Sequence, residues 1–255
     1  MRTFEQACTD AERASAEAFR ATSQVAKVAR QLNRAASVGD LGQIRRLVDR
    51  LGSTMAAARQ EVANAQASWP YTTDEESAYF RDGYEAELLK AASAAGLQMF
   101  KMDDRLISFP SIVRIASAER AVVVNRKRVS TVRPSVLARI LKESQGKKPR
   151  FSSEKFLEAL HEAYRLFVPS DEKGKTIALS KIYQCLTLLP GAGLDYGKSD
   201  FARDLFLLDR SGVHSTRSGS RLSLPASTGT RQAKDTFQFV TPEGETVVYY
   251  GLRFA

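Results

Sequence analysis

The sequence predicts an α+β protein that is mostly helical, and three observations predict this class. Over the first 69 residues, apolar side chains recur at alternating spacings of three and four residues. Between residues 97 and 125 the pattern changes to short runs rich in β-branched and aromatic residues. From residue 151, three amphipathic helical segments precede further short β-rich runs. With 43% hydrophobic and 26% charged residues, the composition is that of a globular chain and excludes disorder of the whole chain.

The N-terminal segment, residues 1–69, is predicted to form an antiparallel coiled-coil hairpin. Two apolar seams meet at Gly39 and Asp40, where glycine suits a helix C-terminus and aspartate can cap the next helix. The first seam is rich in alanine and buries little apolar surface, so we expect this arm to pack on the body of the protein, on a second copy or on a partner protein. The expected seams are Phe4, Ala7, Ala11, Ala14, Ala18, Ala21, Val25, Val28, Leu32 and Ala35, and then Leu41, Ile44, Val48, Leu51, Met55, Ala58, Val62, Ala65 and Trp69.

Residues 70–144 are predicted to form a small basic α+β unit. Thr73 stands three residues before Glu76, as in a capping box, so a helix is expected from there to about Ala95, where Gly96 stops it. β-rich runs and turns follow, and a proline suited to the first turn of a helix then opens another helix. The expected strands are 97–101, 106–109, 112–116 and 120–125, the expected turn is Asp103-Asp104, and the second helix spans 134–143.

Residues 145–150 are predicted to be a linker, and residues 151–255 a separate domain. Ser152 and Ser153 can cap a helix with an apolar face through Phe167, and two more amphipathic helices are expected at 177–189 and 199–210. Expected strands follow at 213–217, 221–225, 236–241 and 245–254.

Three helices followed by a β-hairpin make residues 151–255, about two fifths of the chain, resemble a winged-helix domain in element order. The resemblance implies DNA binding, with the third helix in the major groove and the hairpin against the backbone or minor groove. The third helix, residues 199–210, departs from this pattern because Asp200, Asp204 and Asp209 accompany its two arginines, and carboxylates repel phosphates. We therefore do not expect this helix to read bases.

Positive charge is concentrated in one segment. Residues 105–150 contain twelve Lys or Arg and two acidic residues, whereas the rest of the chain holds 26 basic and 27 acidic residues, so this segment supplies the formal net charge of +9. Such concentration predicts a polyanion-binding face. The alternative is a basic linker that keeps the chain soluble, and residues 142–150 fit that alternative. The predicted phosphate contacts here are Arg126, Lys127, Arg128 and Arg133.

A second basic stretch runs from Arg210 to Lys234 without an acidic residue, and it is rich in Ser, Thr and Gly. Its hydroxyl groups and flexible backbone suit phosphate oxygens, although a solvated loop would have the same composition. The predicted contacts in this second patch are Arg217, Arg221 and Arg231. The two patches could form one track along a nucleic acid, with a steep dependence of affinity on salt.

Catalytic and metal-binding patterns are incomplete. Gly174-Lys175-Thr176 is similar to the end of a P-loop, but Pro169 replaces the first glycine. Asp103 and Asp104 lack the further carboxylate that a metal-dependent nuclease needs. Two cysteines and two histidines offer no zinc-ligand spacing, and we expect no metal, cofactor, disulfide framework or enzymatic activity.

The function predicted from these patterns is non-enzymatic binding of nucleic acid, with double-stranded DNA the expected partner and the arm serving in self-association or assembly. The alternative is an adaptor subunit of a larger DNA-processing, chromosome-organising or antiviral-defence complex, acting through protein–protein contacts. An enzyme whose site is assembled from distant residues comes third. The sequence has no apolar run long enough to span a membrane and no signal-peptide core at its start, so a cytoplasmic location without membrane contact is expected.

Overall fold

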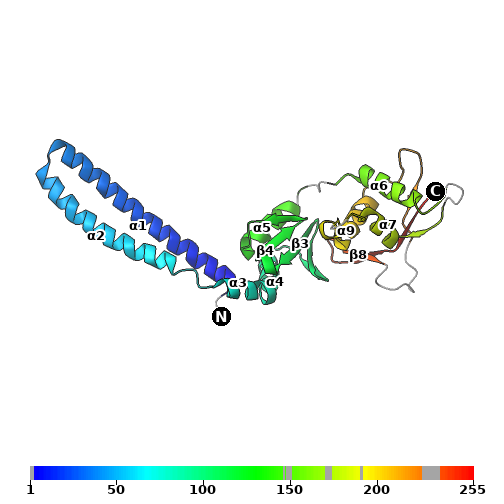
Figure 1. Cartoon of the computed structure of the whole chain (residues 1–255), viewed down its shortest axis with the longest axis horizontal. Helices are drawn as coiled ribbons and strands as arrows, with labels where there is room; N and C mark the ends of the chain where they lie inside the picture. The colour runs from blue at the N-terminus through cyan, green and yellow to red at the C-terminus, as the bar shows by residue number, and fades with distance from the viewer. Residues whose placement is uncertain (1–2, 146, 148–150, 170–173, 190–191, 226–235) are drawn as a thin grey trace. The chain divides into compact units, whose positions relative to one another are not determined.

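The computed structural model describes residues 3–145, 147, 151–169, 174–189, 192–225 and 236–255 (Figure 1). It confirms a mostly helical α+β fold with a long N-terminal helical hairpin. The contacts divide the chain into two compact units, each described separately below. Unit 1 comprises Met1–Glu87 and Arg133–Ser135, and unit 2 comprises Leu88–Val132 and Val136–Ala255. The segment boundaries expected from composition remain predictions.

Unit 1 is built on α1 (Phe4–Val38) and α2 (Leu41–Gln66), which run antiparallel beside each other (Figure 1). The predicted turn residues have the predicted roles. Gly39 has φ +72°, and the Asp40 carboxylate accepts a hydrogen bond from the backbone N–H of Gln43 at 3.0 Å. The start of α1 is closed by a capping box between Thr3 and Gln6. The hairpin is therefore defined at both ends of α1 by local hydrogen bonds.

The seam expected on α1 is confirmed, because each of its residues is buried or partly buried. The seam expected on α2 is half wrong. Ala58 is buried, and Ile44 and Leu51 pack against the core of the hairpin, as expected. Leu47, which was not expected in the seam, is buried as well. Ala65 is also partly buried. The remaining expected members lie at the surface: Leu41 is 74% exposed, Val48 52%, Met55 41%, and Val62 and Trp69 36% each. A run with alternating three and four spacings fits two helix registers, and only the partner helix selects one.

A cluster of aromatic rings surrounds Phe4 at the start of α1. Its ring lies 5.5 Å from the Trp69 ring and 5.1 Å from the Tyr79 ring, measured between centroids, and Tyr71, Phe80 and Tyr84 complete the cluster. The capping box of the following helix is Thr72 with Glu75, one residue earlier than expected. The single helix expected through Ala95 is divided at Gly83 into α3 (Thr73–Asp82) and α4 (Tyr84–Ala94).

The first part of unit 2 is an antiparallel sheet in the order β1-β2-β3-β4-β5. Its strands are β1 (Phe100–Met102), β2 (Arg105–Ser108), β3 (Ser111–Ala116), β4 (Ala121–Val124) and β5 (Lys127–Val129), with a short 3-10 helix, η1 (Ser117–Glu119), between β3 and β4. The expected Asp103-Asp104 turn joins β1 and β2, and α5 (Pro134–Gln145) forms where the proline predicted it. β5 was not predicted from the sequence. The last expected strand, 120–125, corresponds to β4, and after a turn at residues 125–126 the chain pairs with β4 again as β5.

The second part of unit 2 contains three main helices, α6 (Ser153–Arg165), α7 (Leu179–Leu186) and α9 (Lys198–Asp209), and a short α8 (Ala192–Asp195). The strands are β6 (Ile177–Ala178), β7 (Leu222–Ser223), β8 (Phe237–Val240), β9 (Thr246–Tyr249) and β10 (Gly251–Phe254). One sheet has the order β6-β10-β7, and β8 and β9 form a hairpin. Phe201, Leu205 and Phe239 are fully buried in one core that also includes Ile107 and Ile112 of the first sheet.

The strands of this second part differ from expectation in their partners. The hairpin expected at residues 213–225 is reduced to an isolated bridge between Ser215 and Arg221, and β7 pairs with β10 instead. The strand expected at 245–254 is divided at Tyr250, so that β9 pairs with β8 and β10 with β6 and β7. Of the expected linker, residues 146 and 148–150 lie outside the described residues. In the part of the chain that the structure describes, no helix is long and apolar enough to cross a bilayer.

Candidate functional site

A cleft of about 650 Å³ in unit 2 brings together cationic side chains from separate elements. The β4–β5 turn lies on one side, and α6 and α9 contribute residues from the other part of the unit. Asp204 is the only acidic side chain among the described residues of its lining. The cationic lining residues are Arg126, Lys127, Lys147, Lys155 and Arg203.

The β4–β5 turn has positive φ at both central residues, +48° at Asn125 and +68° at Arg126. A type I′ turn requires this, and asparagine and glycine are the residues that favour it. A bulky arginine in the left-handed region costs roughly 1–2 kcal/mol. The Asn125 side chain stabilises the turn, because its Oδ1 accepts a hydrogen bond from the backbone N–H of Ile112 at 3.0 Å and its amide donates to Ser111 Oγ at 3.4 Å.

The Arg126 side chain is positioned but not fully neutralised. Its guanidinium carbon lies 5.5 Å from the centre of the Tyr196 ring, within the range of a cation–π interaction. Its Nε is 4.0 Å from Asp200 Oδ1, the limit for an ion pair, and half of the side chain (51%) is exposed. A cation held by one ring and one distant carboxylate can still bind a stronger anion, such as a phosphate.

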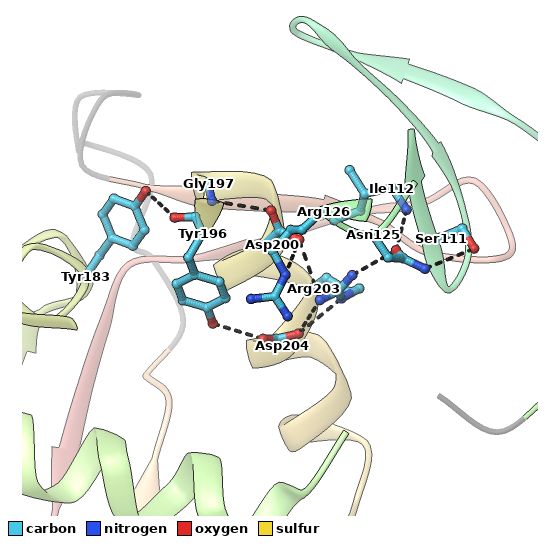
Figure 2. A network of polar contacts seen from close by, with 10 residues as sticks. All are labelled: Ser111, Ile112, Asn125, Arg126, Tyr183, Tyr196, Gly197, Asp200, Arg203 and Asp204. Atoms are coloured by element: carbon cyan, nitrogen blue, oxygen red, sulfur yellow. Dashed lines mark hydrogen bonds and ion pairs between the residues drawn. The ribbon is translucent and has the colours of Figure 1, made fainter. Parts of the chain in front are cut away.

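Beneath the turn, charged side chains of α9 form a buried network (Figure 2). Arg203 binds Asp204 through Nε at 3.0 Å and Nη2 at 2.9 Å, and its Nη1 donates to Asn125 Oδ1 at 3.1 Å. The Tyr196 hydroxyl donates to the other oxygen of Asp204 at 2.9 Å. Arg203 therefore connects α9 to the β4–β5 turn and stabilises the same asparagine that shapes the turn.

Asp200 is the least satisfied member of this network. Its Oδ2 accepts a hydrogen bond from the backbone N–H of Gly197 at 3.3 Å, whereas its buried Oδ1 has no hydrogen-bond partner and lies 3.6 Å from Arg203 Nη2. Burial raises the pKa of the Asp200 carboxyl, and the nearby Arg203 and Arg126 reduce that rise without cancelling it. Burial and the Asp204 carboxylate likewise raise the pKa of Tyr196, which keeps its hydroxyl protonated as a donor.

Two of the three acidic residues of α9, Asp200 and Asp204, are thus used inside the protein. Eight of the twelve residues of this helix are buried, Asp200, Arg203 and Asp204 among them. A helix that enters a DNA groove needs an exposed face of side chains that reach base edges. α9 has no such face over its described length.

The first predicted patch is divided by the fold. Arg126 and Lys127 line the cleft. Arg128 is exposed on β5, with its guanidinium 3.5 Å from the Glu119 carboxylate. Arg133 belongs to unit 1, where its Nε lies 2.7 Å from the Glu5 carboxylate, its Nη1 2.5 Å from that of Glu12, and its Nη2 donates to Thr9 Oγ1 at 2.9 Å.

Of the second predicted patch, neither Arg217 nor Arg221 lines this cleft. Arg217 is exposed, and its backbone N–H donates to the Glu158 carboxylate at 2.7 Å. Arg221 is exposed beside a different pocket of about 510 Å³ that Arg253, His214 and Asp209 also line. Arg231 lies outside the described residues.

Lys155 and Arg203 are site residues that sequence reasoning missed. Each lies in an amphipathic helix whose other cation is at least five residues away, without the local charge density that marked residues 126–128. Lys147 was attributed to a linker, yet it lines the cleft. Only tertiary folding brings these three cations to the β4–β5 turn, so no local pattern could have identified them.

No metal-binding group completes the catalytic patterns among the described residues. No group of three or more His, Cys, Asp or Glu side chains in that part of the chain could hold a metal ion, and the His161 ring packs 4.8 Å from the Phe254 ring. Cys8 and Cys185 are free thiols. Comparisons with protein-family models, curated proteins and solved structures found no match.

Proposed function

We propose that this chain is a non-enzymatic nucleic-acid-binding protein that holds the phosphate backbone, with duplex DNA as its partner. The observation that carries the proposal is the convergence of five cationic side chains with one acidic side chain in the cleft of unit 2. Lysine and arginine contacts to phosphates supply most of the sequence-independent affinity for nucleic acids. In this proposal Lys127 and Lys155 contact phosphates directly, and Arg126 exchanges its distant carboxylate for a phosphate.

The second part of unit 2 is proposed to be a winged-helix-like domain adapted to backbone contact. Support comes from the order of its main helices, α6, α7 and α9, which precede the paired strands β7 and β10. The burial of α9 argues against groove reading by the third helix. Specificity for sequence is therefore not part of the proposal, because phosphate contacts position a protein without reading bases.

The proposal is tested by fluorescence anisotropy of labelled duplex and single-stranded oligonucleotides across a salt series. We expect wild-type affinity for duplex DNA to fall steeply with salt. Lys127→Glu/Lys155→Glu should lower affinity at low salt by about a hundredfold and reduce the slope of log K against log salt by about 1.8, because two phosphate contacts are lost.

A matched control carries the same change of charge away from the cleft. Lys90→Glu/Lys181→Glu alters two lysines of unit 2 that are absent from the cleft lining, on α4 and α7. Its affinity should stay within about threefold of wild type, as expected for a long-range and screened effect. Equal losses in the two double variants would show general electrostatics rather than a cleft, and no wild-type binding at low salt would refute the proposal.

A second candidate function is that of an adaptor subunit, and the apolar stripe exposed on α2 favours it. Contiguous exposed apolar surface marks sites of protein–protein contact. If wild-type protein binds neither oligonucleotide at low salt, the adaptor function becomes the better proposal, and the hairpin is then the part to use for identifying a partner.

A further inference from the structure

One face of the α1–α2 hairpin is largely apolar and open to solvent. On α2 its residues recur every seven positions: Leu41, Val48, Met55 and Val62. On α1 the corresponding positions are small and also exposed: Ser15, Thr22, Ala29 and Ala36. We call these eight residues the hairpin face. None of them carries a charge, whereas 26% of the whole chain is charged.

The pattern on α2 is that of a helix with two apolar contacts. Ile44, Leu47, Leu51 and Ala58 point to α1 and account for the two seam positions of each heptad. The residues of the hairpin face occupy a third apolar position in the same heptads. Two-stranded coiled coils need only the two seam positions, and the third is typical of a helix in a bundle. The hairpin face therefore has the apolar pattern of a helix bundle but is exposed to solvent in a single copy.

The hairpin face is hollowed over part of its length. A groove of about 310 Å³ lies between the helices in the half of the face away from the Gly39 turn, with Thr22 and Val25 of α1 opposite Met55 and Val62 of α2. Arg59 and Gln66 also line it, at its edge. The large side chains stand on α2 and the small ones on α1, so the face has a ridge beside a shallow channel. Such a face is complementary to itself when a second copy is turned about an axis parallel to the hairpin.

We propose that a second copy of this chain covers the hairpin face and forms a four-helix bundle. The α2 ridge of each copy packs on the small residues of α1 in the other copy. The twofold axis runs along the hairpin, and the Gly39 turns of both copies lie at the same end. This assembly does not depend on nucleic-acid binding.

The area of the hairpin face is sufficient for a stable dimer. α2 has 26 residues and is about 39 Å long at 1.5 Å per residue. Two helices of about 10 Å diameter side by side give a footprint of roughly 800 Å² per copy. Specific protein interfaces bury about 800 Å² on each partner.

The charges beside the hairpin face favour the same orientation. Arg45 and Arg59 stand at the edge of the face on α2, on opposite sides of its centre and at similar distances from it. If α2 packed on α2 with the hairpins reversed, Arg45 of one copy would face Arg59 of the other, and like charges across an interface are unfavourable. In the proposed orientation these arginines meet the edge of α1, where the corresponding residues are the uncharged Phe19 and Asn33. Phe19, now 72% exposed, would also be covered.

The test is the molar mass of the full chain, measured by size-exclusion chromatography with light scattering in 0.5 M NaCl after nuclease treatment. We expect twice the chain mass of 28.2 kDa. Val48→Lys/Met55→Lys should raise the dimer dissociation constant more than tenfold and give the monomer mass, because unpaired charges would be buried. Both side chains are exposed in one copy, so helix content by circular dichroism should not change.

Ala57→Lys is the matched control, because it adds a charge to an exposed position on the opposite side of α2. It should remain a dimer. A monomeric wild-type protein at tens of micromolar, or a Val48→Lys/Met55→Lys variant that stays dimeric, would overturn the proposal. These variants leave the cleft of unit 2 intact, so DNA binding can fail or persist independently of the dimer.

Orientation is tested with a spin label at Ser37→Cys, near the turn, after Cys8→Ser and Cys185→Ser replacement. The proposed orientation places the two labels within about 25 Å of each other. The reversed orientation separates them by about 35 Å or more, since each turn lies about twelve residues from the centre of the face. A distance in the longer range would refute the packing of large residues on small ones.

Discussion

Arg126 and Arg133 are seven residues apart in one basic segment, yet the fold gives them opposite surroundings. Arg133, in unit 1, has two carboxylates and a hydroxyl within 2.9 Å of its guanidinium. Arg126, in unit 2, is half-exposed and has one carboxylate at 4.0 Å. Charge density along a sequence therefore identifies a basic segment, whereas the acidic residues brought near by folding decide which cations can bind a ligand.

Arg203 represents a third case, in which the cation is buried and paired. Removing one partner of a buried pair leaves charge that neither water nor a counterion can reach. We therefore expect three different outcomes of substitution. Replacing Arg203 should lower the stability of unit 2, replacing Arg133 should lower the stability of unit 1, and replacing Arg126 should lower the affinity for DNA.

The largest effect is expected for Arg203→Met. This substitution leaves Asp204 and Asp200 without their buried counterion and removes the hydrogen bond to Asn125. We expect unit 2 to lose about 3–5 kcal/mol of stability. Hydrogen–deuterium exchange of peptides from α9 and β4 measures the loss.

Arg128→Ala is the matched comparison, because this exposed arginine pairs with Glu119 at the surface of the same unit. Its effect should be below about 1 kcal/mol. Similar losses in Arg203→Met and Arg128→Ala would mean that the network of α9 does not stabilise unit 2.

A smaller effect is expected for Arg133→Ala, in unit 1. The loss of its contacts to Glu5, Glu12 and Thr9 should lower stability by about 1–2 kcal/mol without changing DNA affinity. The only tryptophan of the chain, Trp69, belongs to unit 1 and packs against Phe4, so its fluorescence during urea unfolding reports on this unit. If Arg133→Ala lowered the affinity for DNA, Arg133 would be a phosphate contact, as first predicted.

The stability difference between wild type and Arg133→Ala should depend on pH. Burial raises the pKa of Glu5, but hydrogen bonds from Ser135 and Arg133 outweigh it, so the pKa lies below its usual value of 4.5. A lowered carboxyl pKa contributes stability above the unfolded-state pKa, and this contribution is lost as pH falls through the folded-state value. The difference between wild type and Arg133→Ala should therefore narrow below pH 4.5. A constant difference down to pH 3 would contradict this role for Glu5.

The smallest expected effect separates backbone strain at Arg126 from its charge. Arg126→Gly and Arg126→Ala remove the same guanidinium, but only glycine adopts φ +68° without strain. The glycine variant should be more stable than the alanine variant by about 1 kcal/mol. Both should bind DNA more weakly than wild type by the same factor, measured by anisotropy. Equal stability of the two variants would mean that this turn stores no strain.

The sequence predicted local features well and distant contacts poorly. Gly39, Asp40, Ser152 and the proline at the start of α5 act through neighbouring residues, and their roles were predicted. The register of α2 depends on α1, and the pairing of β7 with β10 depends on a strand about thirty residues away. The same limit applies to the site, where Lys127 was predicted from its neighbours but Lys155 and Arg203 reach the cleft only through tertiary packing.

The order of the sheet β6-β10-β7 has a consequence for biosynthesis. Its middle strand is the last of the three to be synthesised, and within the described part of the chain β6 and β7 pair only with it. Between Ala178 and Gly251 a ribosome adds more than seventy residues, which takes roughly 4–15 s at 5–20 residues per second. During that interval β6 has a free edge and the neighbouring helices lack a sheet to cover them. The sheet of the nascent chain therefore stays incomplete for several seconds, until the four residues of β10 are added.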